Sequence, residues 1–354
     1  MLYIIFPDNN KTNNKQGKTM NNTHSTSRIR ISLRIILSAV FALLPLVAMD
    51  NALACAACGC TLSKDWGTQG ISTTPGFSAD LSYDYVNQDQ LRYGSGTAST
   101  AQISGLLPGG QEVEDYTTTR TTTASLSYTG DSWGVSAQLP FVQRTHGTFG
   151  NVLPGDYSTY SSSSDSGIGD IRIIGKYTGF SADKTAGIVA GIKLPSGSTS
   201  ATFSDGVTAL DRSLQIGTGS TDVILGGFVT GTLAEYGWFA QGTLQHAVAT
   251  KTIAGADYHP GDAYSINTGI RRAKFGAKFS PMLQLNYIHR SPDDVGGIPL
   301  DGGTLVYLAP GASFRAGGGT SFYGFLQLPV YQNVVGLQLT PRYTATVGVT
   351  HSYE

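Results

Sequence analysis

Three cysteines, Cys55, Cys58 and Cys60, lie within six positions of the 354-residue chain. Thiolates at this spacing can wrap one Cu or Zn ion. In an oxidising compartment two of them can instead form a disulfide, and Cys55 could also carry a lipid. A c-type haem is excluded because Gly59, and not His, follows Cys58. A metal site, a disulfide and a lipid anchor therefore stay open.

A second set of candidate residues is charged and lies in segments where polar and apolar residues alternate. Four acidic and seven basic side chains fall on the polar face of predicted strands: Asp80, Asp84, Arg144, Asp170, Arg172, Lys176, Lys193, Asp222, Arg271, Arg290 and Arg342. If these strands close into a barrel, the eleven side chains line a pore whose charge is positive overall, which predicts a weak preference for anions. The alternative, of about equal weight, is that the charges pair across the lumen.

The N-terminal region has the features of an export signal. Arg28, Arg30 and Arg34 precede an apolar run over residues 35–48, and Ala52-Leu53-Ala54 supplies the small residues that a signal peptidase reads. We therefore expect residues 1–54 to be a signal peptide, with translation starting at Met20. Residues 55–75 are then a Cys-containing periplasmic tether or a plug.

The remainder, residues 76–354, alternates with the period of a β-strand. In the last segment Tyr343, Ala345 and Val347 share one face, and Thr344 and Thr346 share the other. About twelve such segments follow one another, and their connections alternate between long and short. A soluble β-sandwich also alternates but has no reason to sort its loops in this way. The pattern predicts an all-β, antiparallel transmembrane β-barrel of about twelve strands in the bacterial outer membrane, with both termini in the periplasm.

Composition and motifs exclude other classes of protein. Only 13% of residues are charged and the net charge is −1, which argues against nucleic acid as a partner. The histidines stand apart, and none lies near a nucleophile motif, so we expect no enzyme activity. The Gly-rich segments at Gly167 and Gly217 lack the lysine and the helix of a phosphate loop.

Several segments resemble a known family. They are Gly167-Ile168-Gly169-Asp170, LPSG at 194–197, GTGSTDV at 217–223, YHPGDA at 258–263, GGTLVYLAPG at 302–311 and LQLPVYQ at 326–332. The chain is similar here to the outer-membrane transporter-like family named for a MetA pathway of phenol degradation, some of whose members carry a Cys-Gly-Cys segment ahead of the barrel. The resemblance spans about residues 77–353. It implies an outer-membrane barrel with a transport role and does not identify a substrate.

Two functional hypotheses follow. The first is a channel or transporter-like barrel for small solutes, with outer-membrane lipid around it. The second is a structural or assembly barrel whose Cys-bearing N-terminus binds a metal or a periplasmic partner.

Overall fold

The computed structural model describes residues 75–106, 113–150, 160–180, 182–253, 256–272 and 278–353. All of these belong to one compact unit, Asp50–Glu354, and the other unit, Met1–Met49, lies outside the described residues. The predicted signal peptide and the Cys segment therefore lie outside them too.

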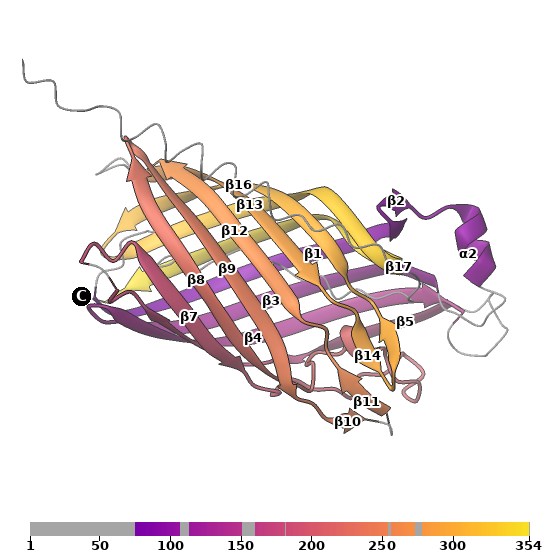
Figure 1. Cartoon of the computed structure of the whole chain (residues 1–354). Helices are drawn as coiled ribbons and strands as arrows, with labels where there is room; N and C mark the ends of the chain where they lie inside the picture. The colour runs from indigo at the N-terminus through magenta and orange to yellow at the C-terminus, as the bar shows by residue number, and fades with distance from the viewer. Residues whose placement is uncertain are drawn as a thin grey trace, which may run out of the picture. The chain divides into compact units, whose positions relative to one another are not determined.

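Antiparallel strands form a closed ring (Figure 1). Among the described residues, eleven strands follow one another around it in the order β17-β16-β13-β12-β9-β8-β7-β6-β4-β3-β1, and β17 pairs with β1 to close it. The strands of this ring are β1 Gly76–Gly94, β3 Val113–Thr129, β4 Trp133–Phe149, β6 Arg172–Tyr177, β7 Ala186–Lys193, β8 Thr221–Leu233, β9 Tyr236–Ala249, β12 Ala263–Arg272, β13 Phe279–Arg290, β16 Gly303–Gly317 and β17 Thr320–Ser352. A further strand, β5 (Tyr160–Ile168), continues the line of β6 along β4.

The last strand passes through the barrel wall twice. The first half of β17 pairs with β16 up to Val334, and its second half pairs with β1 up to Ser352. The bend lies near Gly336, whose φ of +72° disfavours a side chain. Counting β17 twice, the ring has twelve strand passages, which confirms the predicted number.

The two faces of the wall carry different side chains. In the β1–β17 pair, Tyr83 faces Val347 and both are exposed on the outside, whereas Asp84 accepts a 2.7 Å hydrogen bond from Thr346 within the barrel. Many large apolar side chains are exposed along these strands, as lipid requires. Many aromatic side chains lie close to the short turns: Phe77, Trp133, Tyr177, Phe180, Tyr236, Phe279, Phe314, Phe322 and Tyr353. This is the position of an aromatic girdle, which lies at the membrane interface of an outer-membrane barrel.

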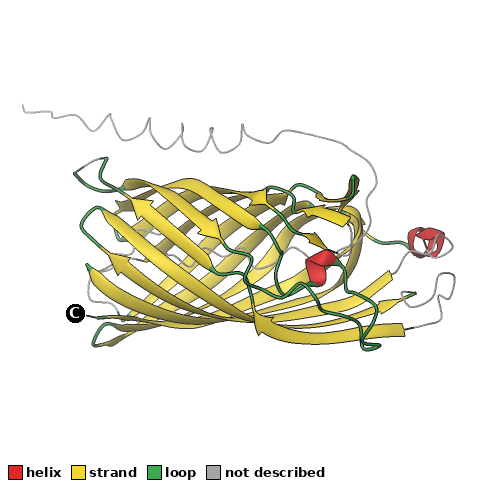
Figure 2. Cartoon of the chain, turned by 90° about the horizontal axis from the view of Figure 1, so that it is seen from below, coloured by secondary structure: helices red, strands yellow, loops and turns green. Residues whose placement is uncertain are grey.

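The connections are sorted between the two ends of the barrel. Short turns at residues 130–132, 234–235 and 318–319 lie at the end with the C-terminus. The opposite end carries the long connections and their short elements (Figures 1 and 2). These elements are β2 Gly96–Thr97, α2 Thr100–Leu106, the 3₁₀ helix η2 Arg212–Leu214, β10 Thr252–Ile253, β11 Ala256–His259, β14 Asp293–Val295 and β15 Ile298–Leu300. The predicted alternation of loop lengths is confirmed. No helix among the described residues is long and apolar enough to cross a bilayer.

The strands β4 and β5 extend further than the sequence predicts. Residues 147–166 read as a loop, yet β4 continues to Phe149 and β5 begins at Tyr160. The segment 161–166 is nearly all Ser, so it shows no apolar alternation, but Ser161 and Ser163 are buried. Beyond the lipid a strand needs no apolar face, so its sequence loses the pattern that would reveal it.

Candidate functional site

A cavity of about 600 Å³ lies inside the barrel. Near the short turns it is lined by Thr129 and Gly134, and among the long connections by Arg212 and Tyr258. The walls contributed by β1 and β3 carry mostly Ser and Thr, because these strands place a small polar residue at every second position. The cavity therefore reaches from one end of the barrel toward the other along a polar wall.

Nine of the eleven charged residues that the sequence singles out lie on this cavity. They are Asp80, Asp84, Arg144, Asp170, Arg172, Lys176, Lys193, Asp222 and Arg290. The structure also adds lining residues that the sequence analysis did not select, among them Arg212, Gln215, Gln245 and Tyr258.

The other two residues, Arg271 and Arg342, do not line the cavity. Arg271 is near the end of β12 and packs beside Gly237 of β9, close to the short-turn rim. Arg342 is exposed and donates a 3.2 Å hydrogen bond from Nε to Asp89. Two register shifts between Asn87 and Gln90 interrupt the regular pairing here, so the alternation no longer places Arg342 with its neighbours.

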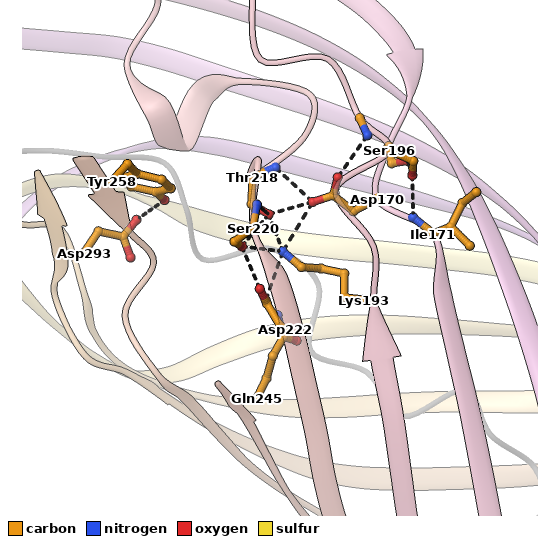
Figure 3. A network of polar contacts seen from close by, with 12 residues as sticks. Asp170, Ile171, Lys193, Ser196, Thr218, Ser220, Asp222, Gln245, Tyr258 and Asp293 are labelled. Carbon is orange, nitrogen blue, oxygen red and sulfur yellow. Dashed lines mark hydrogen bonds and ion pairs between the residues drawn. The ribbon is translucent and has the colours of Figure 1, made fainter. Parts of the chain in front are cut away.

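Lys193 of β7 lies at the centre of a buried network (Figure 3). Its Nζ is 3.3 Å from Asp170 Oδ2 and 2.9 Å from Asp222 Oδ2, and the three side chains are at most 8% exposed. Nζ also donates to Ser220 Oγ at 3.0 Å and to Thr218 Oγ1. Pairing places Lys193 opposite both Asp222 of β8 and Arg172 of β6, and Arg172 interacts electrostatically with both aspartates. Two cations thus balance two buried anions.

Asp170 holds together the two ends of the long β7–β8 connection, residues 194–220, called here the inward loop. Its Oδ1 accepts a 3.0 Å hydrogen bond from Gly197 N, and its Oδ2 accepts bonds from Thr218 N at 2.9 Å and Thr218 Oγ1 at 2.7 Å. Between these ends the backbones of Gly197 and Gly217 touch, since a Cβ on either would lie 2.5–2.6 Å from the other's backbone. The Asp170 carboxylate therefore holds the two ends of the inward loop together.

The inward loop occupies part of the lumen. Arg212, Ser213, Gln215, Ile216 and Thr218 line the cavity together with strand residues. From β4, Arg144 Nη1 donates 2.9 Å hydrogen bonds to the carbonyls of Ser213 and Gln215. Elsewhere Ser204 N donates to Ser162 O of β5 at 2.9 Å. This contact covers the edge of β5 that pairs with none of the described strands. The loop therefore narrows the lumen and completes the wall.

The inward loop also has a small core of its own. Ala201, Phe203, Leu210 and Leu214 form a buried apolar cluster. The Gln215 side chain accepts from Ala201 N at 2.7 Å and donates to Leu210 O at 2.8 Å. At the loop tip the Thr208 hydroxyl and the backbone N–H groups of Val207 and Thr208 donate to Asp205, and these bonds lower the pKa of its carboxyl. Such a loop keeps one conformation.

A substitution at the base of the inward loop tests this packing. Gly217→Ala adds a methyl group that collides with the Gly197 backbone, so we expect the loop to loosen and trypsin to cleave more rapidly after Arg212. The matched control is Gly96→Ala in β2, where a Cβ meets only Tyr93 O at 3.8 Å. Mass spectrometry of the fragments gives the rate. Equal cleavage of both variants and the wild type would argue that the base of the inward loop is not held together by this packing.

The predicted Cu or Zn site at Cys55, Cys58 and Cys60 lies outside the described residues. Within them, no cluster of His, Cys, Asp or Glu is arranged to hold a metal ion. The cysteine site stays a prediction, with the periplasmic partner that it could serve. If the three cysteines bind a metal and do not form a disulfide, the purified mature protein carries about one Cu or Zn per chain, and a variant with the three cysteines changed to Ser carries none, by elemental analysis. Equal metal in both would eliminate the site.

Four histidines have side-chain partners that explain their positions. His146 Nδ1 is 2.8 Å from Thr117 Oγ1, His289 Nδ1 is 2.9 Å from Thr304 Oγ1 and His351 Nδ1 is 2.8 Å from Thr320 Oγ1. His246 Nδ1 lies 2.6 Å from Asp262 Oδ1 at an exposed position. These contacts join neighbouring strands or loops.

A closed antiparallel ring, an apolar exterior with an aromatic girdle and a polar interior define a transmembrane β-barrel of the bacterial outer membrane. Searches found no matching family model and no matching curated protein. The specific family that the sequence resembles is therefore not confirmed, whereas the β-barrel class is.

Comparison with solved structures finds one that shares this fold and others with lower similarity. An outer-membrane channel of Pseudomonas putida F1 is similar over 82% of this chain and 99% of its own, with a TM-score of 0.58 and 12% identity. The translocator domain of the autotransporter NalP from Neisseria meningitidis matches 81% of this chain and 91% of its own, with a TM-score of 0.46 and 10% identity. The P. putida toluene transporter TodX matches 80% of this chain and 91% of its own, with a TM-score of 0.43 and 10% identity.

Proposed function

We propose that this barrel is a channel that passes small solutes across the outer membrane, with a weak preference for anions and without catalysis. One observation carries the proposal: a polar cavity of about 600 Å³ extends between the two ends of a closed barrel. The inward loop makes this route narrow, so the solutes are small. The resemblance to a transporter-like family and the fold shared with a P. putida channel support the same function.

The charges on the cavity wall support the preference for anions. Its lining has six basic residues, Arg144, Arg172, Lys176, Lys193, Arg212 and Arg290, and four acidic ones, Asp80, Asp84, Asp170 and Asp222. The difference, six minus four, is two positive charges. Arg290 is paired with Asp293, 3.0 Å away, which reduces the excess to one. A narrow, slightly positive lumen concentrates anions.

Planar-bilayer recordings test the proposal. The purified protein is expected to give discrete conductance steps, with a reversal potential in a KCl gradient that favours chloride. Arg172→Gln removes a lumen charge and should shift the reversal potential toward potassium. Arg120→Gln is the matched control, because Arg120 lies over the Tyr85 ring and does not line the cavity. A silent barrel would overturn the channel, and a wild type selective for cations would overturn the anion preference.

A further inference from the structure

Arg212 is a cation that the described part of the chain leaves uncompensated. It begins η2 in the inward loop and lines the cavity. All three of its guanidinium nitrogens are buried, and among the described residues none has a hydrogen-bond partner. The desolvation lowers the pKa of Arg212, an effect that a bound anion would reverse. A buried guanidinium is ordinarily paired, so this one is poised for an acceptor from outside the chain.

Tyr258 fixes one face of this guanidinium. The Arg212 Cζ lies over the Tyr258 ring, 5.0 Å from its centre, which is within the range of a cation–π contact. The ring itself is held in place, because the Tyr258 hydroxyl donates a 2.6 Å hydrogen bond to Asp293 (Figure 3). Asp293 in turn accepts a hydrogen bond from Arg290. A cation–π contact leaves the N–H groups of a guanidinium without hydrogen-bond partners, and its paired N–H groups match the two oxygens of a carboxylate.

The cavity that Arg212 lines also has apolar lining residues. Ile216 lies four residues beyond Arg212 in the same loop and lines the cavity, as does Val142 of β4. The Val142 side chain and the Ile216 carbonyl both lie beside Gly169. Ile174, Val189 and Ile224 add apolar lining from β6, β7 and β8. On β1 and β3 the equivalent inward positions are mostly Ser and Thr. Apolar lining residues in the same cavity as an unpaired cation suit a solute with an apolar body and one negative end.

We propose that Arg212 and Tyr258 form a recognition site for small amphipathic carboxylates, with the carboxylate on Arg212 and the apolar body against Ile216 and Val142. The proposal rests on the channel function and names its substrate class. A cavity of about 600 Å³ holds a solute with one aromatic ring, and its volume falls within the range of ordinary small-molecule sites. An inorganic anion would pair with Arg212 but would make no contact with the apolar lining residues.

Calorimetric titration of the full-length protein in detergent micelles tests the site with three probes: benzoate, acetate and benzyl alcohol. Benzoate should bind more tightly than both others, because only benzoate has the charge and the ring. Arg212→Gln should weaken benzoate binding by about tenfold or more, the typical cost of a lost charge-assisted pair, and leave benzyl alcohol unchanged. Arg212→Lys keeps the charge but loses the planar guanidinium, so its affinity for benzoate should fall between those of the wild type and Arg212→Gln.

Two controls make the outcome decisive. Arg120→Gln removes an arginine that lies over a tyrosine ring outside the cavity, and this variant should bind benzoate like the wild type. Heat-modifiable migration on gels shows that each variant is a folded barrel. Benzoate that binds no better than acetate, or binds equally to folded Arg212→Gln, overturns the carboxylate site. Conductance measured on the same samples separates the two proposals: a conducting barrel without benzoate selectivity refutes only the site, and a silent barrel that binds benzoate refutes only the channel.

Discussion

Lys193→Met is expected to destabilise the barrel by about 3–5 kcal/mol, the usual cost of removing one partner from a buried ion pair. The lysine is 2% exposed and lies between Asp170 and Asp222, so methionine leaves two buried carboxylates with only Arg172 to balance them. Unfolding by urea in lipid vesicles, followed by tryptophan fluorescence, measures the change in free energy.

The matched control for this prediction is Lys184→Met. Lys184 also pairs with an aspartate, Asp131, at 2.5 Å, but its side chain is 38% exposed and that of Asp131 is 92% exposed. An exposed pair contributes little, so the free energy of unfolding should change by less than about 0.5 kcal/mol. If the two variants were destabilised equally, the buried network would not be the structural centre that we describe.

Asp170→Ala is expected to change conduction more than stability. It removes the acceptor for Gly197 N and for both donors of Thr218, which opens the base of the inward loop. Lys193 and Arg172 keep Asp222 as their anionic partner, so no carboxylate is left buried without a cation. The expected loss of stability, about 1–3 kcal/mol for the unsatisfied donors, is therefore smaller than for Lys193→Met. Single-channel recordings should show larger and noisier conductance steps, because the loop no longer holds one position in the lumen.

Asp131→Asn serves as the control for that experiment. Asp131 lies in a short turn at the other end of the barrel, away from the inward loop. Its conductance should equal that of the wild type. Conductance steps of unchanged size and noise in Asp170→Ala would show that the hydrogen bonds of Asp170 do not hold the inward loop in the lumen.

The alternation of side chains was sufficient to predict the wall of the barrel. A residue in a lipid-spanning strand must be apolar outward and is free to be polar inward, so Tyr83 and Asp84 reveal their directions by type alone. The same rule placed nine of the eleven predicted charges on the cavity. It failed at Arg342, because the bulges near Gln88 change the direction of side chains without changing the sequence pattern.

The interior of the lumen could not be predicted in the same way. The inward loop read as an external connection, although Phe203, Leu210 and Leu214 are apolar residues that a solvated loop does not need. That signal indicates burial but does not say where. The contacts of Asp170 with Gly197 and Thr218 span 27 and 48 positions, and nothing local in the sequence specifies them. For that reason Arg212 and Tyr258 were missed as lining residues.

The central claim, that solutes pass through the cavity inside the barrel, is tested most directly by blocking it from within. In a background with Cys55, Cys58 and Cys60 changed to Ser, Thr123→Cys places a thiol on the cavity wall, and Ala124→Cys places one on the exposed outer face of the same strand. A bulky thiol reagent should lower the single-channel conductance of Thr123→Cys and leave that of Ala124→Cys unchanged. A barrel that conducts nothing, or that loses conductance equally in both variants, would contradict the account.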